Sequence, residues 1–110
     1  MKMNTSELTN LALNWAVATC EGYEGAPLWV ARQSNASTDW EQGGPIIERH
    51  VPSIGKTRGL GWSAQMAYDY ARDRESPIYY GPTPLVAAMR CYVASKFGDD
   101  VEIPNDFYKD

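Results

Sequence analysis

The segment of this sequence that comes closest to a known chemical motif is Gly55-Lys56-Thr57, which resembles the end of a phosphate-binding P-loop. The complete motif has a further glycine five residues before Gly55, where this chain has His50. It also follows a buried strand, where this chain has Pro52. Both requirements fail, so the sequence excludes a P-loop.

Basic residues around this segment leave a less specific anion site open. Arg49, Lys56 and Arg58 lie in a stretch that has no acidic residue between Glu48 and Asp69. Together with the glycines of the same stretch, they could bind a phosphate through side chains and backbone N–H groups. The alternative is a flexible, solvated basic loop over residues 55–61.

The residue types that usually perform catalysis or bind metals are few and scattered. His50 is the only histidine, and Cys20 and Cys91 lie far apart without the close pairing of zinc ligands. A nucleophile–base pair of either cysteine with His50 stays open, but nothing in the sequence singles it out. We therefore expect no metal site and no cofactor, and we predict that the protein is not an enzyme.

Aromatic residues beside glycines and cations form the most informative pattern. Trp40 stands just before Gly43-Gly44, Trp62 follows the basic stretch, and Tyr80 precedes Gly81-Pro82-Thr83, the expected start of a helix. Aromatic faces near cations and a helix N-terminus suit a ligand that combines a nucleobase with a phosphate. The alternative is that these aromatics belong to the core and to an oligomer interface.

The predicted site assigns stacking to the aromatics, phosphate contact to the basic residues and the Gly43-Gly44 backbone, and a hydrogen bond to Thr83. The candidate ligand-binding residues are Asp39, Trp40, Gly43, Gly44, Arg49, Lys56, Arg58, Trp62, Tyr80 and Thr83.

Two helices have clear sequence signals. Apolar residues recur every three or four positions over residues 5–21, with Asn4 as the expected cap and Gly22 as the expected end. The second helix begins after Thr83 and Pro84 and ends before Gly98. Both apolar stripes predict packing against a common core.

Shorter elements lie between these helices. We predict a strand over residues 28–30 and one helical turn over residues 39–42 that Gly43-Gly44 stops. A short helix from Pro45 follows, which Pro52 ends, and a strand covers residues 62–68, where a helix is the alternative. The predicted fold class is α+β, a small single domain with two main helices packed on a short antiparallel sheet and long loops.

Charge is distributed unevenly along the 110 residues. The formal net charge is −4, and the last twelve residues carry all of it, because their five acidic residues face Lys109 alone. We predict a domain over residues 1–98 and an acidic C-terminal tail over residues 99–110. A neutral body with an acidic tail argues against binding to duplex nucleic acid. No apolar run reaches the roughly 20 residues of a membrane span, and the first residues lack a secretory signal.

Several blocks of the sequence, taken together, resemble the NinX-like family of small phage and prophage proteins. The blocks are residues 37–49, 81–96 and 101–104, with further similarity at residues 5–8 and 15–18. The chain departs most from the family pattern over residues 51–80. The resemblance implies a phage accessory protein made in the cytoplasm of the bacterial host, and it supplies neither a catalytic residue nor a ligand.

We therefore expect a non-enzymatic protein that binds a small nucleotide-derived ligand and sequesters a host immune signalling molecule. A homo-oligomer with its site near a subunit boundary is expected. The alternative function is an inhibitor or adaptor that docks on a host protein through exposed aromatics and the acidic tail. Deleting residues 99–110 is the change that separates the two.

Overall fold

A long apolar helix, α4 (Pro84–Phe97), is the centre around which the other elements of this computed structural model pack. The structure describes residues 2–22, 35–51, 53–59, 61–67, 73 and 76–104. The other elements are β1 (Lys2–Asn4), η1 (Thr5–Glu7), α1 (Asn10–Cys20), α3 (Trp40–His50), β2 (Ser53–Lys56), β3 (Trp62–Gln65), β4 (Ile78–Gly81) and β5 (Asp100–Glu102).

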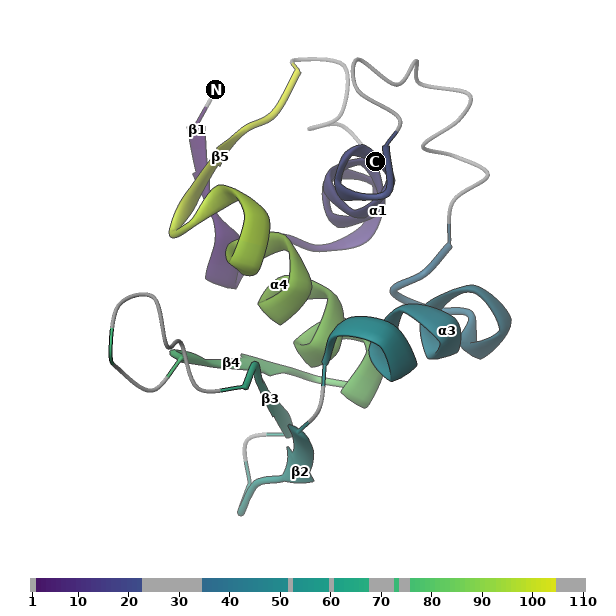
Figure 1. The fold of residues 1–110 in the computed structure, drawn as a ribbon, viewed down its shortest axis with the longest axis vertical. Helices are drawn as coiled ribbons and strands as arrows, with labels where there is room; N and C mark the ends of the chain where they lie inside the picture. The colour runs from purple at the N-terminus through teal and green to yellow at the C-terminus, as the bar shows by residue number, and fades with distance from the viewer. Residues whose placement is uncertain are drawn as a thin grey trace.

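Helix α4 confirms the boundaries that the sequence predicts for it. The Thr83 side chain accepts a hydrogen bond from the Val86 N–H, Pro84 is the first helical residue, and Gly98 follows the end with a φ of +82°. Nearly every side chain between residues 85 and 93 is buried. A helix that is apolar on all sides must be covered on all sides, and α4 packs against the three-stranded sheet on one side and against α1 and α3 on the other (Figure 1).

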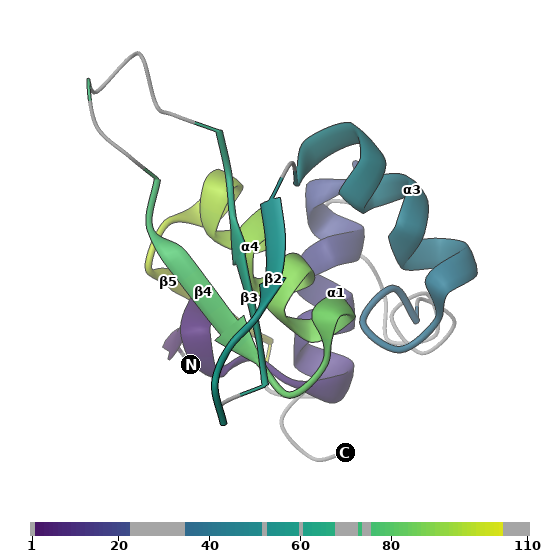
Figure 2. The same cartoon turned by 90° about the horizontal axis from the view of Figure 1, so that it is seen from below.

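Strands β2, β3 and β4 form an antiparallel sheet in that order, with β4 at one edge. The helices lie on one side of this sheet (Figure 2). Along β4 the side chains alternate, with Tyr79 buried toward α4 and Ile78 and Tyr80 each 49% exposed on the outer face. The α+β class is confirmed.

The segment 55–61, predicted as a flexible basic loop, is part of a hairpin. Gly55 and Lys56 belong to β2, and the Thr57 N–H donates to the Gly61 carbonyl to close the turn. The predicted strand after it is confirmed as β3. Strands β1, β2, β4 and β5 were not predicted from the sequence, and the predicted strand over residues 28–30 lies outside the described residues.

The glycines at the centre of α3 do not stop the helix, which runs from Trp40 to His50 without interruption. The prediction of two short helices was wrong because Gly43 has a packing role. A Cβ atom at this position would lie 2.3 Å from the Ala36 carbonyl oxygen and 2.5 Å from the Leu85 Cδ2 atom. Glycine therefore lets α3 approach α4 and the chain before it.

The first predicted helix is two elements rather than one. Asn4 caps the short η1 by accepting from the Ser6 N–H, and α1 begins at Asn10, whose φ of +49° breaks the continuity. The chain leaves α1 through Glu21 and Gly22, where the sequence predicts the end.

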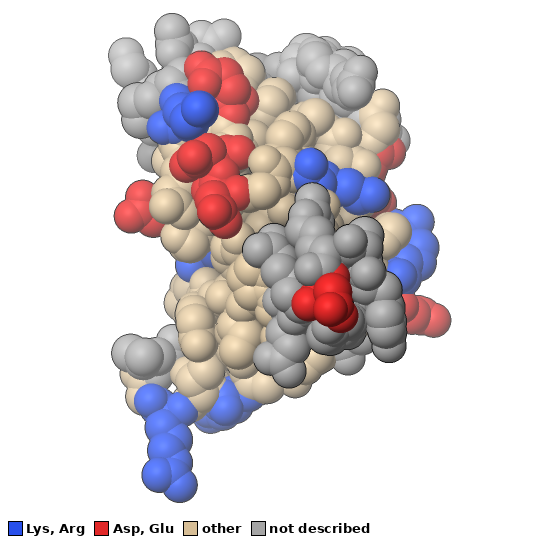
Figure 3. Space-filling model, turned by 60° about the vertical axis from the view of Figure 1, so that its left-hand side comes forward, with Lys and Arg blue, Asp and Glu red and all other residues tan. Residues whose placement is uncertain are grey.

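The C-terminal boundary at residue 98 was also wrong. Strand β5 pairs with β1, and Val101 and Ile103 are buried in the core. Acidic side chains gather at the end of the molecule where β1 and β5 lie, and basic ones project at the end of the β2–β3 hairpin (Figure 3). The domain therefore continues through at least Ile103, and residues 105–110 lie outside the described part.

Candidate ligand-binding groove

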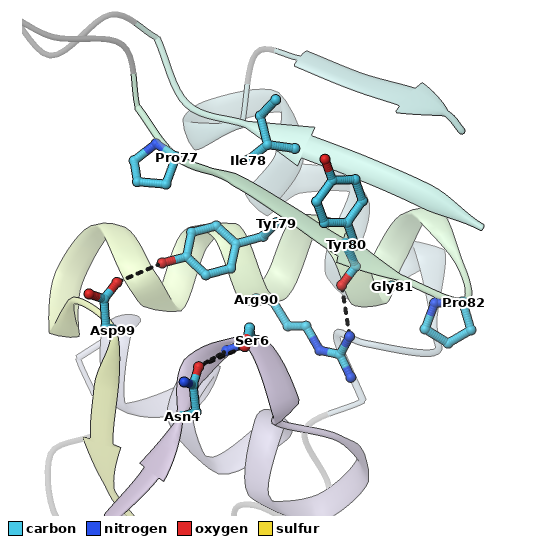
Figure 4. A pocket seen from close by; sticks show the side chains of 10 residues that line it. All are labelled: Asn4, Ser6, Pro77, Ile78, Tyr79, Tyr80, Gly81, Pro82, Arg90 and Asp99. Atoms are coloured by element: carbon cyan, nitrogen blue, oxygen red, sulfur yellow. Dashed lines mark hydrogen bonds between the residues drawn. The ribbon is translucent and has the colours of Figure 1, made fainter. Parts of the chain in front are cut away.

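A groove of about 740 Å³ lies between the outer edge of β4 and the segment formed by β1 and η1 (Figure 4). This volume is in the range of small-molecule sites, roughly 300–1,000 Å³. The residues that line it are Asn4, Ser6, Pro77, Ile78, Tyr79, Tyr80, Gly81, Pro82, Arg90 and Asp99.

Arg90 brings a buried positive charge from α4 to this groove. Only 9% of the residue is exposed. Its Nε donates to the Leu8 carbonyl at 2.8 Å, and its Nη1 donates to the Tyr80 carbonyl at 2.7 Å. In the described part of the chain, Nη2 has no hydrogen-bond partner, and no carboxylate forms an ion pair with Arg90.

The arrangement around Arg90 is unusual in its electrostatics. Burial lowers the pKa of Arg90, while exposed Glu7 acts in the opposite direction, and arginine keeps its charge in proteins. Buried charges are ordinarily paired with an opposite charge because desolvation is expensive. The hydrogen-bond partners of Arg90 are neutral carbonyls and Glu7 forms no ion pair with it, so the groove presents a cation without a directly paired carboxylate.

The backbone of β4 adds hydrogen-bonding groups to the same groove. In an antiparallel pair, the N–H and C=O groups of one residue point to the same side, and the side alternates along the strand. The Tyr80 carbonyl faces Arg90 rather than β3, so the Tyr80 N–H and the N–H and C=O of Ile78 face the groove as well. The Tyr80 ring stands at the rim, over the outer face of the sheet (Figure 4).

The other end of the groove carries a carboxylate. The Tyr79 hydroxyl donates to the Asp99 Oδ1 at 3.3 Å, and the Thr5 N–H holds the Asp99 carbonyl at 2.7 Å. Burial, together with the nearby Asp99 charge, raises the pKa of Tyr79, so its hydroxyl remains a donor. The groove therefore has a cationic end and an anionic end.

The residues predicted as a site from the sequence do not gather in one place. Trp40 and Arg49 lie at opposite ends of α3, nine residues or about 14 Å apart along the helix. The Arg49 Nη2 is 2.7 Å from a Glu21 carboxylate oxygen, and its Nε donates to the Pro45 carbonyl. Arg49 therefore has a structural partner of its own.

The Gly43-Gly44 backbone is not available to a phosphate. The Gly43 N–H donates to the Asp39 carbonyl at 2.8 Å, and Gly44 lies inside α3, where backbone N–H groups bond within the helix. The Asp39 side chain accepts from the Glu41 N–H and caps the same helix. The proposed phosphate contact at these glycines was wrong, and Asp39 acts as a helix cap.

Lys56 and Trp62 are brought together, but away from the groove. They are cross-strand partners in β2 and β3, with the Lys56 Nζ 5.9 Å from the centre of the Trp62 ring. Tyr80 pairs with the residue after Trp62, so the two aromatic side chains point to opposite faces of the sheet. Arg58 lies exposed in the hairpin turn, and Thr83 caps α4. Tyr80 is thus the only residue of the predicted set that lines the groove.

The two cysteine thiols are in environments that disfavour the reactive thiolate. Burial raises the pKa of Cys20 to about 12 and that of Cys91 to about 11, whereas reactive cysteines have lowered values. The His50 ring stacks on the Tyr92 ring, with 4.8 Å between their centres. Within the described ranges, no group of three His, Cys, Asp or Glu side chains is arranged to hold a metal.

Sequence reasoning missed Arg90, although a signal was present. Arg90 and Lys96 are the only charged residues between Pro84 and Phe97, and Arg90 stands in the middle of the apolar run. A single charge in the interior of a buried helix requires buried partners, so it marks a position with a specific role.

Comparison with known proteins identifies the family. The model of the family described as Bacteriophage P22, NinX, matches residues 4–96. The chain belongs to this NinX family. The match includes every groove residue except Asp99. No curated protein matches this NinX-family chain, and the described helices include none that is long and apolar enough to span a membrane.

Proposed function

We propose that this NinX-family protein is a phage accessory protein that binds a small nucleotide-derived anion in the groove beside β4 and does not change it chemically. One observation carries the proposal. Arg90 is buried at the groove without a directly paired carboxylate and with a free Nη2 among the described contacts.

The cationic end suits a phosphate group. A guanidinium presents its N–H donors in a planar fork that matches phosphate oxygens, and hydrogen bonds between charged groups are the stronger ones. The two bonds to Leu8 and Tyr80 hold the side chain in one orientation before a ligand arrives. An anion bound there would supply the direct ion-pair partner that Arg90 lacks among the described residues.

The rim suits an aromatic base. The Tyr80 ring is 49% exposed beside the strand whose N–H and C=O groups face the groove. Stacking of a base on an aromatic side chain contributes about 1–3 kcal/mol and tolerates different bases. A ligand with a phosphate on Arg90 and a base near Tyr80 would use both features.

Binding without turnover agrees with the chemistry of the described residues, whose two thiols have raised pKa values. It is also what sequestration of a host immune signalling molecule requires, which would be an anti-defence activity in the cytoplasm of the infected bacterium. The homo-oligomer stays a prediction.

The alternative function, docking on a host protein through exposed aromatics and an acidic tail, is not proposed, because the residues that the structure describes form no separate tail. Its supposed tail begins with Asp99 and Asp100, which belong to the folded region around β5. Deleting residues 99–110 would remove that strand and two buried side chains, Val101 and Ile103. Such a deletion would therefore test folding rather than partner capture.

The test is calorimetric titration of the purified protein with 5′-mononucleotides of each base, with cyclic dinucleotides and with inorganic phosphate. We expect binding of at least one nucleotide and its recovery in unchanged form after denaturation. Arg90→Lys should weaken that binding at least about tenfold, because lysine lacks the fork that bonds two carbonyls and a phosphate. Lys96→Met is the matched control on the same helix, away from the groove, and should bind within twofold of wild type.

Two outcomes would overturn the proposal. One is a folded wild-type protein that binds none of these compounds, and the other is recovery of a hydrolysed product. If Arg90→Lys does not fold, Tyr80→Ala takes its place, since this exposed residue should lose about tenfold in affinity without affecting the core.

A further inference from the structure

We infer that the groove selects a guanine nucleotide and that Asp99 recognises the base. This inference rests on the proposed function, because it names the ligand class of the same groove. A phosphate bound by Arg90 would occupy the cationic end of the groove and leave the anionic end at Asp99 free for another part of the ligand.

Asp99 presents a free acceptor at that end. Its Oδ1 accepts from the Tyr79 hydroxyl, and within the described residues Oδ2 has no partner. Its backbone is fixed by the Thr5 N–H. Figure 4 shows the carboxylate and the Arg90 guanidinium at separate places along the groove, with the Tyr79 ring between them.

The separation of the two charges sets the orientation of the ligand. Pro77 lies near the Asp99 end of the groove, and Tyr80 contacts Arg90. The chain advances three residues between them, which is about 10 Å in a strand. This length is comparable with that of an extended mononucleotide from its phosphate to the far edge of its base. Because Asp99 repels a phosphate, the phosphate must lie at Arg90, and the base must extend from the Tyr80 end toward Asp99 so that its far edge reaches the carboxylate.

A carboxylate discriminates among bases because it can only accept hydrogen bonds. Adenine and cytosine each place a ring-nitrogen acceptor beside their amino group, and uracil places its single N–H between two carbonyls. Guanine alone places two adjacent donors, N1–H and the N2 amino group, on one edge. The Asp99 carboxylate therefore matches guanine and meets an acceptor on every other base.

The number of cations limits the number of phosphates. Arg90 is the only basic residue that lines the groove among the described residues. One guanidinium can bind one phosphate through its fork of N–H donors, whereas a triphosphate would bring two further phosphates into the groove without a second cation to bind them. Guanosine monophosphate, GMP, is thus the simplest probe that satisfies both ends.

The experiment measures the affinities of GMP and AMP for wild type, Asp99→Asn and Asp100→Asn. Wild type should prefer GMP by about tenfold or more, as a bidentate base contact provides. Asp99→Asn should lose this preference and gain affinity for AMP, since a carboxamide offers one donor and one acceptor. Asp100→Asn, exposed on β5 outside the groove, should behave as wild type.

The outcomes separate this inference from the proposed function. If GMP and AMP bind equally, or if Asp99→Asn keeps the preference for GMP, the guanine assignment is wrong while nucleotide binding stands. If neither nucleotide binds to the folded wild-type protein, both are wrong. Tyr79→Phe provides a second check, because loss of its hydroxyl frees the carboxylate to rotate and should reduce the preference without reversing it.

Discussion

Two arginines in this protein have reversed surroundings. Arg49, at the end of α3, has a side chain that is 56% exposed, yet it has a carboxylate partner in Glu21 at 2.7 Å. Arg90, in the centre of α4, is 9% exposed and has only carbonyl partners. Desolvation would favour a carboxylate partner for Arg90 rather than for Arg49, because a buried charge has the greater need of a counter-charge. Arg49 is therefore a structural residue, and Arg90 is available to a ligand.

The surroundings of Arg49 show what a completed network looks like. The Tyr92 hydroxyl donates to the second Glu21 oxygen at 2.6 Å, and His50 stacks on the Tyr92 ring. These contacts join the C-terminal ends of α1 and α3 to the middle of α4. Cations near helix C-termini are favourable, which suits Arg49 at the end of α3. Arg90 at the groove has no such carboxylate partner among the described residues.

The largest effect should come from removing each arginine in turn. Arg90→Met leaves the Leu8 and Tyr80 carbonyls without their donor, and each unsatisfied buried group costs about 1–3 kcal/mol. We expect the free energy of unfolding to fall by about 3 kcal/mol. Arg49→Met should cost about 0.5–1 kcal/mol, as exposed ion pairs do. Urea unfolding of both variants measures the difference, and equal losses would contradict the distinction between the two sites.

Alanine substitutions at the two glycines of α3 should change the stability of the protein in opposite directions. Gly43→Ala places a methyl group against the Ala36 carbonyl and the Leu85 side chain, and overpacking of this kind costs about 1–3 kcal/mol. Gly44→Ala meets no atom within 4 Å and should stabilise the helix by about 0.5–1 kcal/mol. Thermal unfolding of the two variants compares them directly, and a stabilising Gly43→Ala would refute the packing role.

Acidification should weaken the Arg49 network. Burial alone would raise the pKa of Glu21, but hydrogen bonds from Tyr92 and Arg49 outweigh it and hold the pKa below the usual 4.5. The stability from this carboxylate is therefore present above about pH 4.5 and is lost as the pH falls through the lower folded value. The gap in unfolding free energy between wild type and Glu21→Gln should narrow from pH 7 to pH 3. A constant gap would show that the carboxylate contributes nothing through its charge.

The helix cap of α4 should give the smallest effect. Thr83→Ala removes the acceptor of the Val86 N–H and should cost about 1 kcal/mol. Thr83→Ser keeps the hydroxyl and serves as the control, with an unfolding midpoint in urea close to that of wild type. Because Thr83 lies outside the groove lining, nucleotide affinity should be unaffected by either change.

The parts of the fold that the sequence predicts correctly depend on neighbouring residues. Thr83, Pro84 and Gly98 mark the ends of α4 through local capping and backbone preferences. Gly43 misleads because its requirement for glycine comes from Ala36 and Leu85, which only the tertiary structure brings near. Strand β4, Ile78–Gly81, was missed because its consecutive Ile, Tyr and Tyr do not alternate between apolar and polar types, although the structure places them on alternating faces of the sheet.

The candidate site was less predictable than the fold. Arg90 contacts Leu8, which is 82 positions away in sequence, and Tyr80, which is 10 positions away. Residues such as Lys56 and Trp62 show the right types for a ligand site but are used for a cross-strand contact. The sequence can indicate residues of suitable types for a ligand site. Whether those residues lie together depends on the tertiary structure, here on which strand lies at the edge of the sheet.

The most direct test of the account is the arginine side-chain ¹⁵N NMR spectrum during titration with GMP and then with AMP. Conservative Arg90→Lys and Arg49→Lys variants assign the two Nε–H signals. We predict that the Arg90 signal shifts in a saturable manner with the nucleotide while the Arg49 signal does not move. A saturable shift of Arg49 with Arg90 unchanged, or no shift of either signal at millimolar nucleotide, would contradict the claim that the Arg90 guanidinium beside β4 binds the phosphate.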